Sequence, residues 1–203
     1  LAEQRAEIEA RLQEATELVF LNVVPVVENI PVPLEYSVTP PSGFQVVDVT
    51  EYARSRYALD GVNGNIVKYS DSNNQNALAW LQESSEKPLK GVALAVDGNV
   101  WVAKSNGEIQ RYYKGTYQEL VSLPVFPLVS GIQDIATNAN TQYLAILEPS
   151  KNRVLLFQKE TRTIRQYQNS MFAGATDIVF SLDGVSLYVK SLNAVYKIEN
   201  IAE

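Results

Sequence analysis

Two residue types that carry much of enzyme chemistry are missing from this chain. Its 203 residues include no cysteine and no histidine. Without cysteine there is no disulfide, thiolate nucleophile or thiolate metal ligand, and without histidine the commonest general base and the commonest zinc ligand are missing. These absences exclude most familiar active sites, and we expect no catalytic residue and no cofactor. The compartment stays open, because a chain without cysteine folds in oxidising and reducing surroundings alike.

Positive charge is also scarce. The chain has 17 Lys and Arg against 23 Asp and Glu, which gives a net charge of −6. Binding to nucleic acid depends on fields of Lys and Arg that this balance does not provide. Hydrophobic residues make up 46% of the chain, but no uninterrupted run is long enough to cross a bilayer. We therefore expect neither a nucleic-acid partner nor direct membrane insertion of this segment.

Four short β-rich segments repeat along the chain. They read NIVKY, EIQRY, RVLLF and AVYKI, at residues 65–69, 108–112, 153–157 and 194–198. Their first residues are separated by 43, 45 and 41 positions. A nearly fixed period in this range is typical of a repeat architecture.

Each repeat contains further predicted strands around this segment. A second run precedes it, at residues 56–60, 99–103, 142–147 and 186–190. A third lies further upstream, at residues 45–49, 91–96, 132–137 and 176–180, and three repeats end with a fourth run, at residues 76–82, 116–123 and 163–168. Asn-Gly and Asp-Gly pairs between the runs are strong hairpin signals. Each unit therefore reads as a four-stranded antiparallel meander, with units at about 44–89, 90–129, 130–170 and 171–203.

The hairpins carry a resemblance to a known superfamily. GVALAVDGNVWV at 91–102 and DIVFSLDGVSLYV at 177–189 resemble the opening hairpin of a blade in the broad NHL, SMP-30 and WD40-like superfamily. The resemblance covers roughly residues 44–203 and implies an all-β fold, a β-propeller of about four four-stranded blades. It extends to architecture only. The chain has no Gly-His or Trp-Asp dipeptide of WD40 type, and no stretch matches the metal-binding residues of the SMP-30 lactonases.

The last unit offers three strands and needs a fourth at its edge. We predict that residues 33–39 pair with residues 194–199 and close the ring, with residues 17–24 as the runner-up. Two other arrangements stay open. Residues 17–43 could form most of an irregular fifth blade, or two chains could join their edges into an eight-bladed assembly.

The region before the repeats divides into two parts. Residues 1–21 have an apolar stripe at helical spacing, which predicts a connector helix. Residues 22–43 hold five of the nine prolines and read as an extended linker that includes the closing strand. Because the chain begins in what reads as mid-helix, we expect it to be the C-terminal part of a larger bacterial protein. A surface location or an upstream membrane tether fits this expectation.

Acidic residues recur at the start of the innermost predicted strands. Asp48, Asp134 and Asp177 hold this position in three units, and Gly91 holds it in the fourth. Beside a central channel they could form a ring that holds calcium through oxygen ligands. We favour the other interpretation, in which each carboxylate accepts backbone N–H groups and fixes the blade spacing.

One basic aromatic cluster follows the second repeat segment. Arg111, Tyr112, Tyr113 and Tyr117 lie close together in sequence. We interpret them as an amphipathic strand end, with a weak prediction of a contact surface, rather than as a platform on which bases stack.

These observations favour a non-catalytic interaction or scaffolding module that binds a protein or glycan through loops on one face, as a monomer or a homodimer. One alternative is a metal-dependent hydrolase or lactonase of SMP-30 type, with calcium at the mouth of the channel. The other is a subunit that assembles by completing its open blade between chains.

Overall fold

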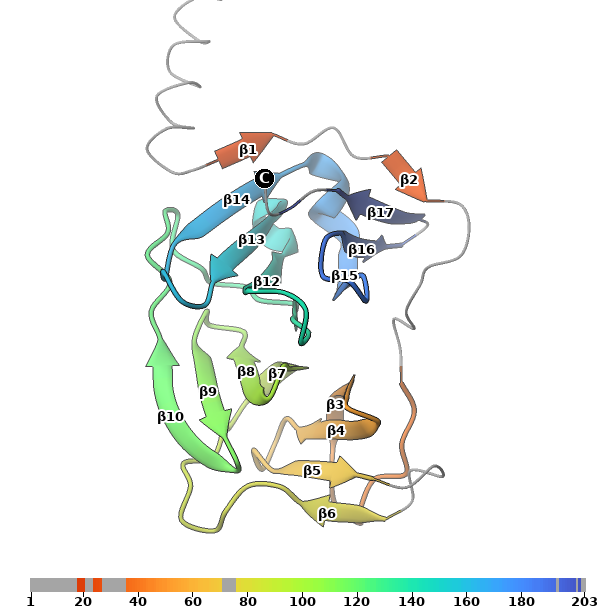
Figure 1. Ribbon diagram of the computed structural model, residues 1–203, viewed down its shortest axis with the longest axis vertical. Coiled ribbons are helices and arrows are strands. Elements are labelled where there is room, and N and C mark those ends of the chain that lie inside the picture. The colour runs from red at the N-terminus through yellow and green to blue at the C-terminus, as the bar shows by residue number, and fades with distance from the viewer. Residues whose placement is uncertain are drawn as a thin grey trace, which may run out of the picture.

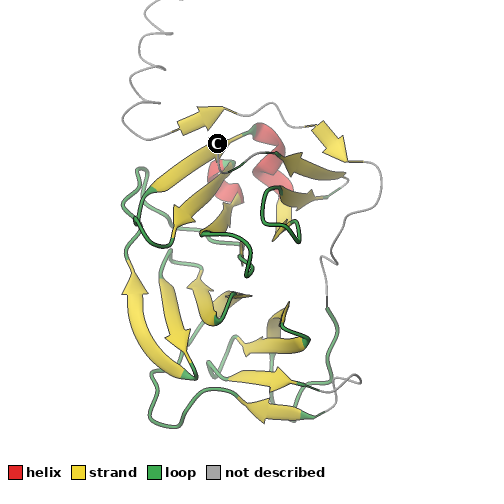
Figure 2. Cartoon of the chain, in the orientation of Figure 1, coloured by secondary structure: helices red, strands yellow, loops and turns green. Residues whose placement is uncertain are grey.

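Four sheets, antiparallel except for one outer strand, surround a central axis (Figure 1). The computed structural model describes residues 18–20, 24–26, 36–70, 76–192, 194–199 and 201. Within them strands dominate, and the helical turns are the two short 3-10 turns η1 (Pro149–Lys151) and η2 (Ser170–Gly174) (Figure 2). The predicted all-β fold, a four-bladed β-propeller, is confirmed. No helix in these described ranges is long and apolar enough to span a membrane.

Each blade is built from strands that follow one another in the chain. The first blade contains β3 (Val46–Tyr52), β4 (Ser55–Asp60), β5 (Ile66–Tyr69) and β6 (Ala77–Ala79). The second contains β7 (Gly91–Val96), β8 (Asn99–Lys104), β9 (Ile109–Tyr113) and β10 (Thr116–Val121). The third contains β11 (Asp134–Ala136), β12 (Tyr143–Glu148), β13 (Arg153–Gln158) and β14 (Ile164–Gln168). The fourth contains β15 (Ala175–Phe180), β16 (Leu187–Ser191) and β17 (Ala194–Ile198).

Two N-terminal strands lie on the outside of the last two blades (Figure 1). β1 (Leu18–Phe20) runs parallel to β14, and β2 (Val24–Val26) runs antiparallel to β17. The prediction that 33–39 pairs with 194–199 is therefore wrong, because β2 occupies the edge of β17. The runner-up segment, 17–24, contains β1 and only the first residue of β2. Pro25 is compatible with this place, since an outermost strand tolerates a residue without an N–H donor.

The N-terminal strands also change two other expectations. Leu18–Phe20 was assigned to the connector helix but forms β1, while residues 1–17 lie outside the described residues. β1 and β2 extend existing blades, so the described residues form no fifth blade.

Hydrophobic clusters join successive blades. Leu59 and Leu94 belong to the cluster between the first and second blades, Leu144 and Phe157 to that between the second and third, and Ile178 to that between the third and fourth. Side chains alternate across a strand, so each sheet packs against a neighbour with one face or both. These three clusters make the blades a continuous stack.

The first blade differs on its remaining face. Ala58, Val67 and Tyr69 pack there against Val38 and Phe44 of the segment 36–44. The hydroxyl of Tyr69 also donates a hydrogen bond to the Thr39 carbonyl (2.9 Å). No hydrophobic cluster among the described residues joins the fourth blade to the first. The segment 36–44 therefore covers the face of the first blade that would otherwise pack against the fourth blade.

A buried ion pair holds the connector between β10 and β11. Arg153 donates to Glu148 (2.6 Å) and to the Pro127 carbonyl (2.6 Å), and Glu148 accepts the backbone N–H of Ser130 (2.9 Å). Both charged side chains are almost completely buried. Since buried charges need partners, this network fixes the connector over the third blade.

Candidate functional site

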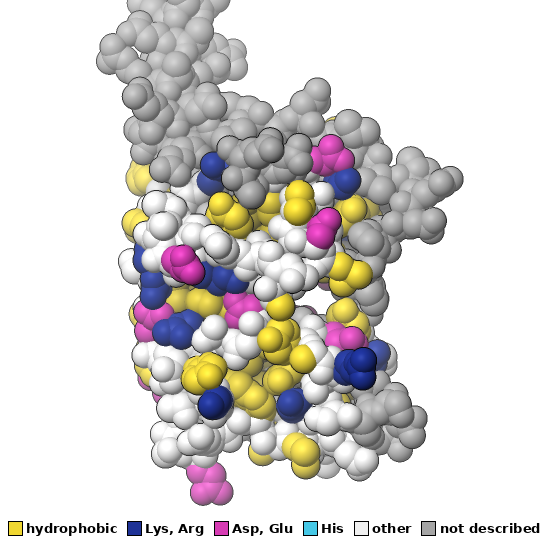
Figure 3. Space-filling view, in the orientation of Figure 1, with side chains coloured by type: hydrophobic (Ala, Val, Ile, Leu, Met, Phe, Trp, Pro, Cys, Tyr) yellow, Lys and Arg dark blue, Asp and Glu magenta, His cyan; other side chains and the backbone are white. Residues whose placement is uncertain are grey.

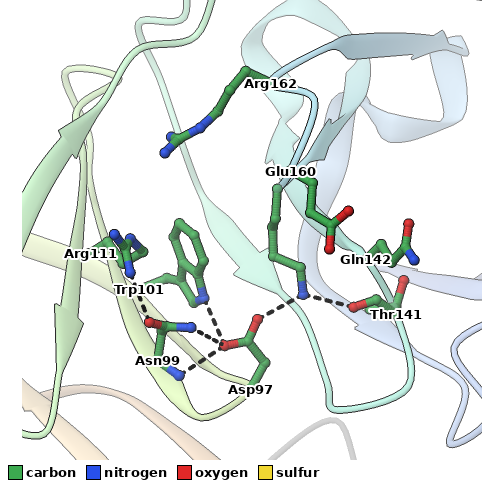
Figure 4. A pocket seen from close by; sticks show the side chains of 9 residues that line it. Asp97, Asn99, Trp101, Arg111, Thr141, Gln142, Glu160 and Arg162 are labelled. Atoms are coloured by element: carbon green, nitrogen blue, oxygen red, sulfur yellow. Dashed lines mark hydrogen bonds and ion pairs between the residues drawn. The ribbon is translucent and has the colours of Figure 1, made fainter.

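A polar cavity of about 370 Å³ lies between the second and third blades (Figure 4). Its residues come from β8 and β9 and from the turns that end β7, precede β12 and follow β13. They are Asp97, Asn99, Trp101, Arg111, Thr141, Gln142, Lys159, Glu160 and Arg162. On the surface the cavity falls where Lys, Arg, Asp and Glu side chains gather over the junction of these two blades (Figure 3). Two repeats therefore build the cavity together.

An ion pair crosses the floor of the cavity from one blade to the other. Lys159 donates to Asp97 (2.7 Å), to the Thr137 hydroxyl (3.1 Å) and to the Thr141 carbonyl (2.7 Å), so all three of its ammonium protons are engaged. The other Asp97 oxygen accepts the indole N–H of Trp101 (3.1 Å). The exposed fractions of the Lys159 and Asp97 side chains are only 16% and 7%. The pair therefore joins the blades and presents little free charge.

Two arginines share one carboxylate at the first wall of the cavity. Glu119 of β10 accepts from Nε of Arg111 (2.8 Å) and from Nη2 of Arg162 (2.8 and 3.0 Å). Partial burial alone raises the pKa of Glu119, but the hydrogen bonds from Arg162 and Arg111 outweigh it and lower that pKa. Glu119 is therefore ionised, and two guanidinium charges against one carboxylate leave one positive charge in excess.

The two guanidinium groups retain free donors. Arg111 uses Nε on Glu119 and Nη1 on Asn99 (3.0 Å), and Arg162 uses Nη2 alone. Nη2 of Arg111 and both Nε and Nη1 of Arg162 have no acceptor within the described part of the chain. A guanidinium group offers five N–H donors in a planar fork that suits carboxylates.

The opposite wall carries one carboxylate and one amide. Figure 4 shows Glu160 and Gln142 on one side of Trp101 and Arg111 on the other, with Arg162 extending from the side of Glu160 to a position above the Trp101 ring. In the described ranges the exposed Glu160 carboxylate has no hydrogen-bond or ion-pair partner. The cavity therefore separates its charge, with a cationic wall facing an anionic one.

The turn after β13 explains why Glu160 and Arg162 reach the cavity. The side-chain oxygen of Gln158 accepts the backbone N–H groups of Glu160 (2.6 Å) and Thr161 (2.7 Å). The backbone N–H of Arg162 returns to the Gln158 carbonyl (3.0 Å), with φ of 64° at Arg162. One glutamine thus closes the turn and sets the direction of both side chains.

A second cavity, of about 430 Å³, runs along the first blade and the segment 41–44. The Asp60 carboxylate in its lining accepts the N–H groups of Val62 and Asn63 and the Asn63 side chain, and Lys87 donates to Asn65. These groups stabilise local turns of the first blade and of the segment that follows it.

The channel aspartates lie close enough to affect one another's charge, but two of them are directed at backbone N–H groups. Asp48 accepts the N–H groups of its neighbour Val49 (2.7 Å) and of Leu94 in the next blade (2.6 Å). Asp134 repeats this with Ile135 (2.8 Å) and Ile178 (2.8 Å). Each carboxylate therefore joins the innermost strands of two blades, as the backbone interpretation predicts.

The other two positions differ. Asp177 accepts from the Thr176 hydroxyl (2.6 Å) and lies 3.5 Å from the Lys190 ammonium. In the second blade Ala93, and not the expected Gly91, occupies the equivalent place, because Ala93 directly follows the β-bulge of its strand as Asp48 and Asp177 do in theirs. No group of three or more acidic side chains in the described ranges is arranged to hold a metal ion.

Burial perturbs the two bridging aspartates. It raises the pKa of Asp48 to about 7, although the N–H groups of Leu94 and Val49 act in the opposite direction. Burial, followed by the charge of Asp48, also raises the pKa of Asp134 well above its ordinary value. These carboxyl groups therefore hold protons at a higher pH than ordinary aspartates.

The predicted basic aromatic cluster is divided between surface and core. Arg111 lines the cavity and the Tyr113 side chain is 46% exposed. Tyr112 is fully buried and packs edge to face against the half-buried Tyr117, with ring centroids 5.7 Å apart. Tyr112 cannot contribute to a contact surface, because side chains on β9 alternate and Tyr112 faces the core.

The remaining cavity residues were not predicted as a site. Asp97 and Lys159 are separated by 62 positions in sequence and meet only because turns of adjacent blades lie at the same end of their sheets. The Asp-Gly turn after β7 and the polar turn after β13 were visible signals. Nothing in the sequence showed that the two turns meet.

The chain is thus a four-bladed β-propeller with a polar cavity between two blades. No protein family model matches it, and no curated protein matches it. A streptogramin B lyase structure is 16% identical with a TM-score of 0.56, over 78% of this chain and 52% of that one. Virginiamycin B lyase from Staphylococcus aureus is 14% identical (TM-score 0.54; 79% of this chain and 57% of that one). A chain of a nidogen/laminin complex is 12% identical (TM-score 0.56; 73% and 56%).

These similarities concern the fold. At such identities the sequences do not align as relatives, and the chain spans about half the length of the solved structures it matches. The matched structures include lyases and a chain of a protein complex, so the shared fold does not select a function.

Proposed function

We propose that this chain is a non-catalytic binding module, which holds part of a protein or glycan ligand in the cavity between the second and third blades. The observation that carries the proposal is the cavity itself. It is concave, built from two blades, and lined by polar groups whose donors and acceptors are not all used within the described residues. Such a combination is the usual basis for a binding-site hypothesis.

The chemistry of the lining supports binding over catalysis. Lys159 donates all three of its protons, and Asp97 already accepts from Lys159 and Trp101, so neither is free to move a proton. Glu160 is exposed and stands apart from any paired acid or base within the described residues. General acid–base catalysis needs a positioned group that can exchange a proton with the substrate, and the described hydrogen bonds of Lys159 and Asp97 already occupy both groups.

The two alternatives have less support. A calcium-dependent hydrolase would need several channel carboxylates on one ion, whereas Asp48 and Asp134 each direct both oxygens at backbone N–H groups. Assembly through an open fourth blade loses its premise, because β2 of the same chain covers β17. Whether the protein is a monomer or a homodimer stays a prediction.

The test is a binding panel read by backbone amide NMR. Neutral oligosaccharides, acidic oligosaccharides and short peptides are titrated into the labelled protein, and shifts are mapped onto the structure. We expect at least one ligand class to perturb the turns 97–99 and 158–162, and Gln142→Tyr to abolish this by filling the cavity. The matched control is Gln118→Tyr, on the exposed side of β10. Shifts that avoid both turns with every ligand would contradict the proposal.

A further inference from the structure

We infer that the group bound in this cavity is an acidic sugar, with its carboxylate held by Arg111 and Arg162 and its hydroxyl groups held by Glu160 and Gln142. The inference rests on the proposed function and adds the chemical class of the ligand. It follows from the separation of charge across the cavity.

The first step concerns the cationic wall. Glu119 neutralises only one of the two guanidinium groups, so this wall keeps one positive charge. The free donors are Nη2 of Arg111 and Nε and Nη1 of Arg162, so a carboxylate can take one N–H from each arginine with its two oxygens, which a single hydroxyl cannot do. An anionic oxygen pair is therefore the ligand group that this wall fits.

The second step concerns the opposite wall. Glu160 offers acceptor oxygens only, and the amide nitrogen of Gln142 remains a donor while its oxygen accepts from Gln158 (3.1 Å). A carboxylate acceptor beside an amide donor can bind hydroxyl groups, and the charge of Glu160 would repel a second carboxylate. A ligand with a carboxylate at one end and hydroxyl groups at the other satisfies both walls, and a uronic acid has this arrangement.

The third step separates a glycan from a protein. Protein interfaces are anchored by apolar or aromatic side chains in desolvated pockets. The cavity lining contains one such residue, Trp101, and its side chain is almost completely buried. Strongly exposed apolar side chains lie at both ends of the strands, with Phe126 and Leu128 in the connector and Leu182 in the β15–β16 turn, but none of the three lines the cavity. A polar cavity without an apolar anchor fits a sugar better than a peptide.

The size of the cavity agrees with a small group. Its volume of about 370 Å³ lies at the lower end of the usual range for ligand pockets, about 300–1,000 Å³. A single sugar residue or a disaccharide is therefore the expected occupant, and any longer glycan would continue across the exposed turns.

The experiment uses Trp101 as its reporter. The chain has two tryptophans, and Trp80→Phe leaves Trp101 as the only one, in the cavity floor. Fluorescence is titrated with D-glucuronic acid, with a disaccharide that carries it, with glucose as the neutral match, and with N-acetyl-glutamate amide as the acidic peptide match. We expect a saturable change with both glucuronic ligands, and affinities for glucose and the peptide match weaker by about tenfold or more.

Variants then locate the carboxylate. Arg162→Gln should weaken binding of the glucuronic ligands by about tenfold and leave glucose binding within about twofold, since only the acid uses the guanidinium group. Lys87→Gln removes one positive charge on the opposite loop face. It should change neither the affinity for the glucuronic ligands nor the affinity for glucose. Arg162→Lys keeps the charge without the planar fork and should fall between wild type and Arg162→Gln. Thermal midpoints confirm that each variant is folded.

The outcomes separate the two proposals. Equal binding of glucose and glucuronic acid, or a glucuronic affinity that ignores Arg162→Gln, overturns the acidic sugar while a cavity ligand still supports the binding module. Tighter, Arg162-dependent binding of the peptide match overturns the sugar in favour of an acidic side chain of a protein. If neither the sugars nor the peptides perturb Trp101 or the cavity amides, both proposals fail.

Discussion

The carboxylate of Asp48 accepts the backbone N–H of Leu94 at 2.6 Å, across the junction of the first and second blades. Asp134 and Ile178 repeat this relationship between the third and fourth blades. The two intervening positions have no such bond, since Ala93 has no carboxylate and Asp177 turns to Thr176 and Lys190. Alternate junctions of the ring are therefore joined by carboxylates.

This relationship predicts a pH dependence of stability. The folded-state pKa of Asp48 is raised to about 7, above its value in the unfolded chain. Between these two pKa values the folded state binds more protons than the unfolded state, so rising pH lowers the free energy of unfolding. We expect the contribution of Asp48 to be full below about pH 4 and to be lost progressively up to about pH 7.

The measurement compares wild type with Asp48→Asn by urea unfolding from pH 4 to 8. The free energy of unfolding of the wild type, minus that of Asp48→Asn, should fall as pH rises, because only the wild type loses this contribution. Asp183→Asn, an exposed aspartate whose pKa is lowered by its hydrogen bonds with Ser181 and Val185, is the control and should not reproduce the trend. A constant difference between wild type and Asp48→Asn would contradict the assignment.

The second prediction concerns the buried pair of Glu148 and Arg153. Arg153→Met leaves Glu148 in the interior without its main partner, so we expect the free energy of unfolding to fall by about 3–5 kcal/mol. Chemical denaturation measures this directly. The exposed pair of Lys104 and Glu108 provides the control, since Glu108→Gln should cost less than about 1 kcal/mol. Equal effects would mean that burial does not set the strength of the first pair.

The third prediction concerns the closing strand β2. Deletion of residues 1–26 removes β2 and leaves the edge of β17 unpaired, and unpaired edges associate with other chains. We expect the truncated protein to show an apparent mass that rises with concentration in light scattering. Deletion of residues 1–17 alone keeps β1 and β2. This shorter truncation should have the same number of chains per particle as the full protein. An unaltered mass after the longer deletion would show that β2 is dispensable.

The fourth prediction concerns a turn glycine. Gly107 has φ of +96°, and an added Cβ would lie 2.3 Å from the Val129 carbonyl oxygen. Gly43 also has positive φ, +76°, but an added Cβ there would meet nothing within 4 Å. Gly43→Ala should therefore cost about 1–2 kcal/mol for the backbone alone. Gly107→Ala should cost clearly more, and thermal unfolding of the two variants isolates the effect of the contact.

The blades could be predicted from the sequence because each repeat carries its own hairpin signals. Asn63-Gly64 and Asn106-Gly107 mark turns, and both glycines have positive φ in the structure. The closing strand could not be placed with the same certainty. Pro25 makes the sequence of β2 resemble a linker. The pairing of β2 with β17 also depends on how the ring brings distant parts of the chain together.

The candidate site shows the same limit. The aspartate recurrence was visible, and its interpretation as backbone bonding is confirmed at Asp48 and Asp134. Asp97, Lys159 and Arg162 belong to turns that are unremarkable by themselves, and their meeting depends on how one blade packs on the next. Local sequence patterns predict single strands and turns. This cavity forms only where the turns of two blades meet.

No described hydrophobic cluster joins the fourth and first blades, so the ring is a stack of four blades with two distinct ends. Three junctions are packed like a protein core, and at the remaining one the segment 36–44 lines the face of the first blade. In a ring of four, the junction that holds the cavity lies diametrically opposite this remaining junction. The two ends of this stack are therefore covered by different parts of the chain, the first blade by the segment 36–44 and the last by β2.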